Sequence, residues 1–156
     1  MNLSELPPIP MVDDRPINFI EHIWHYLSPF SAHQIEIWGE SFATVEHAYH
    51  WARYNPGPEK DAVKAAKSPM ECLHISHIFK KREGVLNPSF DKDAVMEELF
   101  RAKLAQHPHV LEILKLTGNR SLLKEIATDP YWGTGTDGSG QNQMGKLWMK
   151  LRAELN

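Results

Sequence analysis

The sequence has little of several features that would define other classes of protein. One cysteine in 156 residues, Cys72, excludes an intramolecular disulfide. No apolar run reaches the length needed to cross a membrane, and the first residues lack the basic and apolar segments of a secretory signal. A net charge of −3 gives no broad basic field, so tight nonspecific binding of nucleic acid is not expected. These absences predict a cytoplasmic protein that has no membrane partner.

A metal site is also not expected, although the chain has nine histidines. His47 with His50, and His74 with His77, are each three residues apart. Neither pair belongs to an H-E-x-x-H sequence, and one cysteine cannot complete a zinc site. We therefore predict no metal and no cofactor.

The length and composition are those of one globular domain. Hydrophobic residues make up 42% of the chain and charged residues 24%, which allows a sizeable core. Four prolines among the first sixteen residues predict an extended N-terminal arm over 1–16, followed by a domain over 17–156. No internal repeat or interdomain linker is present.

The predicted fold is a predominantly helical α+β domain of six or seven helices with one small β-hairpin. The apolar segment 17–30 has no clear period and is predicted to be extended. Alternation over 34–38, a turn at Gly39-Glu40 and a return over 41–43 predict the hairpin. Helices are expected over 45–53, 59–67, 69–81, 87–106, 108–116 and 120–127, and from Asn142 to the C-terminus. The expected N-caps are Thr44, Ser68 and Asn142.

A glycine-rich run, 129–152, leads into the last of these helices. It contains Gly133, Gly135, Gly138, Gly140 and Gly145. A glycine-rich loop before a helix N-terminus exposes backbone N–H groups to a phosphate or another anion. Neither G-x-G-x-x-G nor a P-loop occurs here, so an ordinary turn before a helix is an equal alternative.

One stripe of the 45–53 helix carries Glu46, His50 and Arg53. Glu46 lies in the first turn, where the helix dipole favours an ionised carboxylate that suits a base, a nucleophile or an electrostatic stabiliser. Arg53 could form a bidentate contact with phosphate. The alternative is structural: a carboxylate that helps to cap the helix and a surface ion pair.

Lys103 and Trp132 are the other two candidates. Lys103 follows Leu99 by four residues and Met96 by seven, which places it on the apolar face of its helix. Such a lysine either extends its amine to solvent or enters a cavity, where desolvation lowers the pKa and the neutral amine can attack a sugar aldehyde. Trp132, beside flexible glycines, either covers the core or stacks on a base.

Several segments, in this order and with this spacing, resemble the NADAR family, also called YbiA-like. They are L-S-P-F at 27–30, S-F-A-T-V-E-H-A-Y at 41–49, Y-W-G-T-G at 131–135, Gly138, Asn142, Gly145, and M-K-L-R at 149–152. The match runs from about residue 17 to residue 155. It implies a YbiA-like fold and an N-glycosidase. The family's known substrates are ribosylamino-pyrimidine intermediates of riboflavin synthesis and ADP-ribosylated guanine in nucleic acid.

The resemblance also implies roles for individual residues. Glu46 matches the acid of the family's E-H motif, Lys103 a lysine in an A-K-F element, and Asp129 the acid before W-G, and these are the expected catalytic residues. The expected contacts to a nucleotide or ribose-phosphate ligand are Ser28, Phe30, His50, Arg53, Trp132, Gly133, Gly135, Asp137, Asn142 and Gly145.

Three positions depart from the family pattern. Pro29 replaces an asparagine, which removes one polar contact, and Arg53 replaces a lysine. Pro88 and Phe90 stand where a tryptophan is often found, which argues against the riboflavin intermediate as substrate. The alternative functions are a noncatalytic module that binds ADP-ribose or NAD, and a structural or partner-binding protein. The sequence predicts no oligomeric state.

Overall fold

The computed structural model describes residues 13–155 and has the predicted α+β architecture. Within these residues the order is β1 (Ile17–Asn18), the 3₁₀-helix η2 (His22–Leu27), β2 (Ile35–Ile37), β3 (Glu40–Phe42), α1 (Val45–Arg53), α2 (Pro58–Ala65), α3 (Pro69–Phe79), α4 (Lys92–Gln106), α5 (Pro108–Leu116), β4 (Leu122–Leu123) and α6 (Gln143–Ala153). Residues 1–12 of the predicted arm lie outside the described part of the chain.

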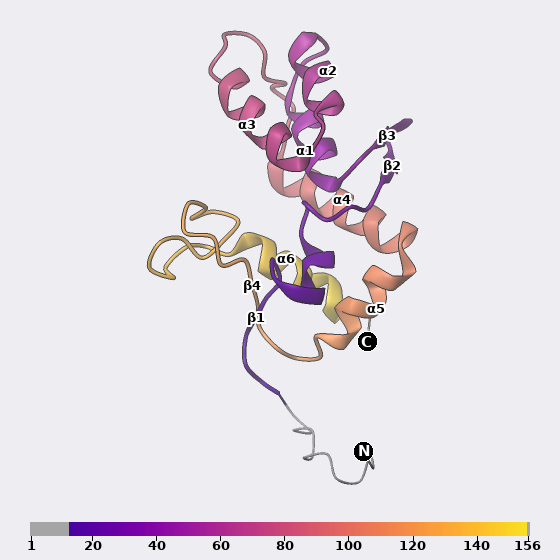
Figure 1. Cartoon of the computed structure of the whole chain (residues 1–156), viewed down its shortest axis with the longest axis vertical. Coiled ribbons are helices and arrows are strands. Elements are labelled where there is room, and N and C mark those ends of the chain that lie inside the picture. Colours follow the sequence, from indigo (N-terminus) through magenta and orange to yellow (C-terminus); the bar gives the residue numbers. More distant parts are fainter. Residues whose placement is uncertain (1–12, 156) are drawn as a thin grey trace.

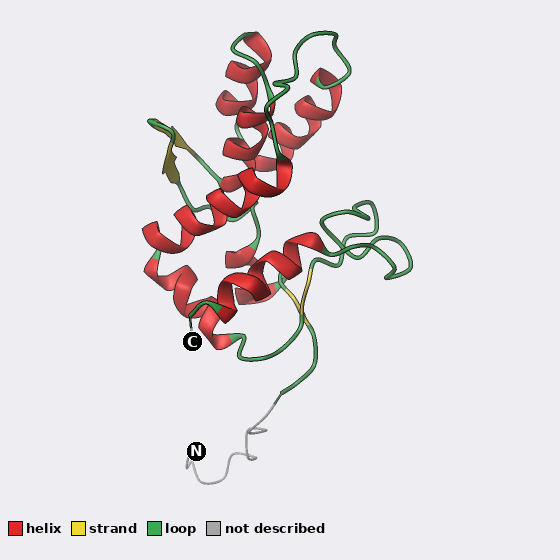
Figure 2. Cartoon of the chain, turned by 180° about the vertical axis from the view of Figure 1, so that it is seen from behind, coloured by secondary structure: helices red, strands yellow, loops and turns green. Residues whose placement is uncertain are grey.

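Helix α4 connects the two ends of the molecule (Figure 1). At one end, α1, α2 and α3 pack on one another, with the β2–β3 hairpin beside them. At the other end, α5 and α6 lie near η2 and the short β1–β4 pair. The long loop between β4 and α6 projects to one side, and Figure 2 shows that it contains no regular element.

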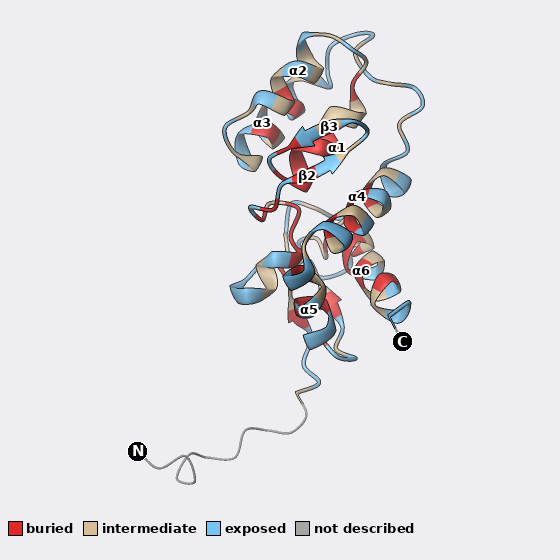
Figure 3. Ribbon diagram, turned by 90° about the vertical axis from the view of Figure 1, so that its right-hand side faces the viewer, coloured by how far each residue is buried: buried red, intermediate tan, exposed pale blue. Residues whose placement is uncertain are grey.

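The core forms where α4, α6 and η2 meet. The rings of Phe100 and Trp148 stack with centroids 4.0 Å apart, and both are fully buried. The indole Nε1 of Trp148 donates a hydrogen bond to the Leu27 carbonyl at 2.8 Å, so the buried ring has its polar atom satisfied. Tyr54, Val63 and Cys72 form a second, smaller cluster among α1, α2 and α3. Figure 3 shows the buried residues gathered along these contacts.

Local sequence signals are confirmed at the hairpin and at two helix starts. β2 and β3 pair antiparallel, with Ile35 opposite Phe42. The Thr44 hydroxyl accepts the His47 N–H, and the Ser68 hydroxyl accepts the Glu71 N–H, as expected of N-caps. The hairpin turn is one residue earlier than predicted, because Trp38 and Gly39 both have positive φ, the geometry of a two-residue turn.

Five predicted elements differ in the structure, and one of them, helix α2, spans Pro58–Ala65 where 59–67 was predicted. Residues 17–30 form β1 and η2 and are not extended throughout, and residues 120–127 form no helix but contain β4, which pairs parallel with β1. That pairing joins segments about a hundred residues apart, so no local pattern indicates it. Helix α3 ends at Phe79, before the predicted Lys81. Helix α4 begins after the N-cap Asp91, because Asn87 instead closes a turn by accepting the Ser89 N–H.

The helices of the described residues, 13–155, include none that is long and apolar enough to cross a membrane.

Candidate active site

Helix α1 places a buried carboxylate beside a buried imidazole. Glu46 and His50 are 8% and 3% exposed, and His50 Nε2 donates a hydrogen bond to Glu46 Oε1 at 2.8 Å. One helical turn separates the two residues, which is why their side chains meet. The Glu46 side chain forms this hydrogen bond through Oε1 only, which leaves Oε2 for a water or a ligand.

The second ring nitrogen of His50 has no partner. Among the described residues, His50 Nδ1 is the one buried side-chain nitrogen or oxygen that makes no hydrogen bond. A buried polar atom without a partner costs about 1–3 kcal/mol. With Nε2 donating to the carboxylate, Nδ1 carries a lone pair, so a hydroxyl or N–H group of a ligand fits there.

Aromatic rings surround Tyr49, the residue of α1 that precedes His50. Tyr49 is 4% exposed and makes edge contacts with Phe90 and Trp132, at centroid distances of 5.4 Å and 6.1 Å. The Arg53 guanidinium lies over the rings of Tyr49 and Phe90 and donates to the Tyr49 hydroxyl at 3.2 Å. Burial raises the pKa of Tyr49, against the opposing influence of Arg53. The predicted residues Arg53 and Trp132 therefore lie on either side of one tyrosine.

Lys103 is fully buried, as its position on the apolar face of α4 suggested. Its Nζ donates to the Ser28 carbonyl at 2.9 Å and to the Ser31 hydroxyl at 2.6 Å. No carboxylate forms an ion pair with it within the described part of the chain. Burial lowers the pKa of Lys103 to about 7, so a neutral amine is present near neutral pH.

One turn joins Lys103 to Glu46. The Ser28 carbonyl accepts from Lys103, and the next carbonyl, that of Pro29, accepts the Glu46 N–H at 3.1 Å. Within the turn, the Ser28 hydroxyl accepts the Phe30 N–H. The L-S-P-F segment thus supports both candidate catalytic residues, although no hydrogen bond connects their side chains.

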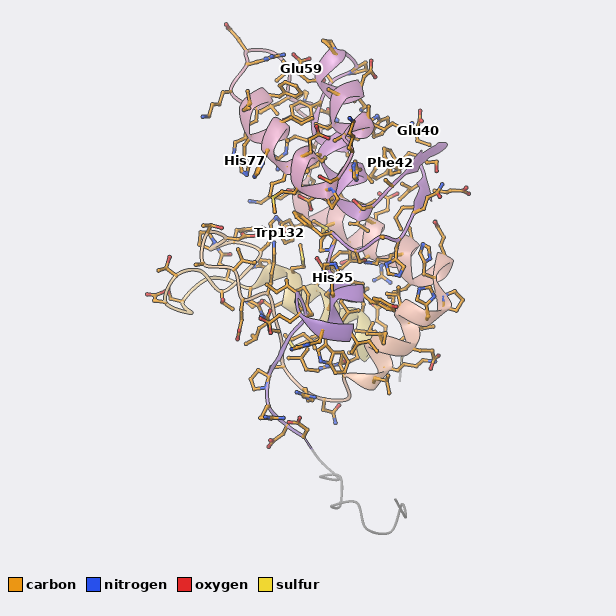
Figure 4. All side chains as sticks on the ribbon, in the orientation of Figure 1. His25, Glu40, Phe42, Glu59, His77 and Trp132 are labelled. Carbon is orange, nitrogen blue, oxygen red and sulfur yellow. The ribbon has the colours of Figure 1, made fainter. Side chains whose placement is uncertain are left out.

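Asp129 and Trp132 are connected through the glycine-rich loop. Asp129 accepts the Trp132 N–H at 2.9 Å through Oδ1 and forms an ion pair with Lys124 at 2.7 Å through Oδ2. Both carboxylate oxygens are therefore occupied by groups that hold the loop. Figure 4 shows Trp132 on the same side of the molecule as His77 of α3.

The N-terminus of α6 does not match the anion cradle that the sequence suggested. The N–H groups of Asn142, Gln143 and Met144 donate to the carbonyls of residues 133, 131 and 132. Asn142 occupies the N-cap position, but its side chain does not cap the helix. It adopts a left-handed conformation, and its amide bonds the Leu122 carbonyl and the Lys124 N–H. The loop's own carbonyls thus use the donors that a phosphate would need.

Close packing explains why two positions of the loop are glycine. A Cβ at Gly133 would lie 2.7 Å from the Lys124 carbonyl oxygen, and one at Gly145 would overlap the Leu122 carbonyl and the Asn142 amide. Gly135 has positive φ and is half-buried, and the exposed Asp137 accepts from Ser139 in its own turn. Ligand contacts at Gly133, Gly135, Asp137, Asn142 and Gly145 remain predictions.

Several residues of this region were not singled out as ligand contacts in the sequence. Tyr49 is the last residue of the matched segment 41–49 and has no feature that marks a ligand contact, and Phe90 lies where the family pattern often has a tryptophan. Lys124, which pairs with Asp129, gave no signal, because a loop–loop ion pair has no sequence period. Burial lowers the pKa of His77 on α3, and the neighbouring cations Lys80 and His50 lower it further.

Two hollows of the surface lie away from these residues. One lies on the hairpin and another beside the end of α6, and their linings do not include Glu46, Lys103 or Trp132. Across residues 13–155, no group of three or more histidine, cysteine or acidic side chains is arranged to hold a metal ion.

The burial of Lys103 predicts how the free energy of unfolding depends on pH. Because the pKa of Lys103 is lowered on folding, the unfolded chain binds more protons than the folded one between about pH 7 and the unfolded pKa, 10.5. Below pH 7 the protein carries the whole free-energy cost of burying the ammonium, and this cost decreases as the pH rises through this window. Relative to Lys103→Met, the free energy of unfolding of the wild type should increase with pH by at most roughly 1.4 kcal/mol per unit. Urea denaturation from pH 6 to 10 measures it, and a difference independent of pH would contradict the burial of a protonatable amine.

Comparison with known proteins defines the class to which this fold and site belong. The NADAR domain family matches residues 18–156, and the chain belongs to that family. The NMR structure of the Escherichia coli protein YbiA has a TM-score of 0.78 and 28% identity, covering 93% of this chain and 87% of that one.

Two relatives are similar over most of their length. The chain is 29% identical to N-glycosidase YbiA of Escherichia coli K12, over 93% of this chain and 91% of that protein. It is 32% identical to N-glycosidase Npun_R5314 of Nostoc punctiforme, over 82% and 83%. A maize protein named for riboflavin biosynthesis, PYRR, is 29% identical over 99% of this chain but only 28% of its own length. These matches confirm the predicted family and the predicted enzyme class, a hydrolase acting on N-glycosyl bonds.

Proposed function

We propose that the protein hydrolyses the N-glycosidic bond of a phosphorylated, ribosylated base. The observation that carries the proposal is that two buried ionisable residues meet at one turn: the Lys103 amine and the Glu46 backbone N–H donate to its consecutive carbonyls. A buried lysine without an acidic partner destabilises a fold, and a hydrophobic side chain would fill the same space. Catalysis gives a reason for its presence.

Lys103 is the nucleophile of this mechanism. Its neutral Nζ attacks the anomeric carbon of the ribose, the carbon–nitrogen bond to the base breaks, and the base leaves with the bonding electrons and takes a proton from solvent. Loss of a proton from the attacking nitrogen and opening of the ring give a Schiff base. Because Lys103 is fully covered in this structure, substrate binding must expose its Nζ.

Glu46 completes the hydrolysis. Its free Oε2 accepts a proton from the water that adds to the Schiff base carbon, and expulsion of the amine then restores Lys103 and releases the sugar. The hydrogen bond from His50 holds Oε1 and fixes the carboxylate. The lone pair of His50 Nδ1 accepts a ribose hydroxyl, which fills its missing hydrogen bond.

The aromatic side chains and Arg53 bind the rest of the ligand. Trp132 stacks on the base, and the Arg53 guanidinium, which donates one side-chain hydrogen bond to Tyr49, directs further donors to phosphate. Asp129 positions Trp132 through its N–H and is assigned here to loop support, since both of its oxygens are engaged.

The experiment is base release measured together with binding. The wild type is incubated with ADP-ribosylated guanosine and, separately, with ribosylamino-pyrimidine phosphate, and the guanosine or the free pyrimidine that is released is quantified by chromatography. Borohydride added during turnover should reduce the Schiff base and leave a sugar on Lys103, detected by peptide mass spectrometry. Base release without an adduct would replace the lysine route by direct attack of water activated by Glu46.

Removal of the Trp132 ring should weaken binding. Stacking on a base contributes about 1–3 kcal/mol, so Trp132→Ala should raise Kd about 5- to 150-fold, whereas Trp132→Phe should retain most of the affinity. Isothermal titration with ADP-ribose measures both. Trp24→Ala, on η2, is the matched control, and an equal loss there would attribute the effect to folding.

A further inference from the structure

A chain of hydrogen bonds leads from the buried amine of Lys103 to the surface. Lys103 Nζ donates to Ser31 Oγ at 2.6 Å, and Ser31 Oγ lies 2.7 Å from His33 Nδ1. His33 Nε2 in turn lies 3.0 Å from His109 Nε2. Lys103, Ser31 and His33 are buried, whereas His109, on the first turn of α5, is exposed.

We propose that Ser31, His33 and His109 form a proton relay through which Lys103 exchanges protons with solvent. The proposal rests on the proposed function, in which Lys103 must lose a proton before it attacks the sugar. The amine itself has no exposed surface, so without such a chain each proton transfer would require the surrounding turn to open.

The donors and acceptors of the chain can all be oriented in one direction when the Ser31 hydroxyl, which also has the Tyr26 carbonyl as an acceptor at 3.3 Å, points to His33 at 2.7 Å. Lys103 gives a proton to Ser31 Oγ as the Ser31 hydroxyl gives its own to His33 Nδ1. His33 then gives its Nε2 proton to His109 Nε2, and the far nitrogen of His109 releases one to water. The balance is one proton lost by Lys103 and one gained by solvent, and rotation of the hydroxyl and exchange of the histidine tautomers reset the chain.

The surroundings keep the middle of the relay neutral. Burial lowers the pKa of His33 to about 4, with Lys103, His107, His109 and His25 contributing as neighbouring cations. A neutral imidazole can accept at one nitrogen while it donates at the other, which a charged one cannot do.

The remaining neighbours of His33 are outside the chain. The edge of the Tyr26 ring faces His33, with centroids 5.1 Å apart, and its hydroxyl forms none of the hydrogen bonds of the chain. His107 also contacts the His33 ring, but its Nε2 donates to the Gln34 carbonyl. His107 therefore offers a matched control: a histidine that touches the same ring without belonging to the path.

The first experiment measures proton exchange at Lys103 without substrate. Nitrogen-15 NMR of the full chain gives the exchange rate of the Lys103 Nζ protons with water between pH 6 and 8. His33→Phe and His109→Leu should each slow the exchange by at least about tenfold. This is a conservative expectation, because a positioned acid or base typically contributes about a hundredfold or more. His107→Phe should leave the rate unchanged, and Ser31→Thr, which keeps a hydroxyl, should be faster than Ser31→Ala.

The variants distinguish a relay from simple packing. His109 is exposed, so His109→Leu tests the chain even if the buried His33→Phe does not fold. An exchange rate that is unchanged in His109→Leu, or equally slowed in His107→Phe, would overturn the proposal.

The second experiment separates this proposal from the proposed function. In the wild type and in His109→Leu, kcat is measured across the same pH range, and the variant should lose turnover with little change in KM. If the wild type releases no base but the relay variants still slow exchange, the function fails and the relay stands. If base is released and exchange does not depend on His33 or His109, the relay fails and the function stands.

Discussion

Glu46→Gln is expected to lower kcat for base release about 10³-fold while changing the affinity for ligand little. The amide has nearly the same shape and its oxygen can still accept the hydrogen bond from His50 Nε2, 2.8 Å away in the wild type. It cannot accept a proton from water at neutral pH, so the hydrolytic step should be the one that slows. Steady-state kinetics and isothermal titration of the same preparation measure the two effects separately.

The matched control for this substitution is Glu112→Gln on α5. Glu112 is exposed and pairs with Lys115, far from the α1 stripe, so the variant removes one negative charge without touching the site. Its turnover should equal that of the wild type. If Glu46→Gln loses affinity as much as turnover, the carboxylate binds the substrate and does not activate water.

Gly145→Ala is expected to destabilise the protein by about 3 kcal/mol, the upper part of the range for overpacking. An added Cβ would overlap the Leu122 carbonyl of β4 and the Asn142 side chain. Those groups cannot move independently, because the Asn142 amide itself bonds Leu122 and Lys124. Urea denaturation followed by circular dichroism measures the change.

Lys146→Ala, one residue further along α6, is the control. Lys146 is exposed, and alanine is a good helix former, so its free energy of unfolding should stay within about 0.5 kcal/mol of the wild type. Equal stability of Gly145→Ala and the wild type would mean that β4 and α6 separate more easily than the structure indicates.

Elements whose signals are local were predictable from the sequence. Helix α1 combines an N-cap at Thr44, an apolar face and a proline-glycine ending, and its bounds are those expected. Helix α5 also begins at Pro108 and ends at Leu116 as predicted. In these segments, capping and periodicity agree with the tertiary packing.

Elements that depend on distant partners were not predictable. β4 forms because Leu122 and Leu123 pair with Ile17 and Asn18, and the apolar residues of that stretch were interpreted as a helix. Asn142 stands at the start of α6, but its side chain serves β4 and not the helix. Both differences come from contacts of β4 with segments distant in the sequence, β1 in the first case and the start of α6 in the second.

In the candidate site, too, the features set by local spacing were predictable from the sequence, and those set by distant contacts were not. The apolar spacing of α4 placed Lys103 in the core, and the stripe of α1 brought Glu46 and His50 together. The use of both Asp129 oxygens depends on Lys124, a loop residue whose position no pattern specifies. The path from Lys103 through Ser31 to His33 and His109 joins three separate segments, and it needed coordinates.

The central claim, hydrolysis of an N-glycosidic bond at this site, is tested most directly by turnover in ¹⁸O-labelled water. ADP-ribosylated guanosine or ribosylamino-pyrimidine phosphate is incubated with the wild type and with Glu46→Gln, and both products are weighed by mass spectrometry. The account predicts unlabelled guanosine or pyrimidine and a released sugar that carries one ¹⁸O, formed by the wild type and almost absent with the variant. Intact substrate after incubation with the wild type, or equal release by Glu46→Gln, would contradict it.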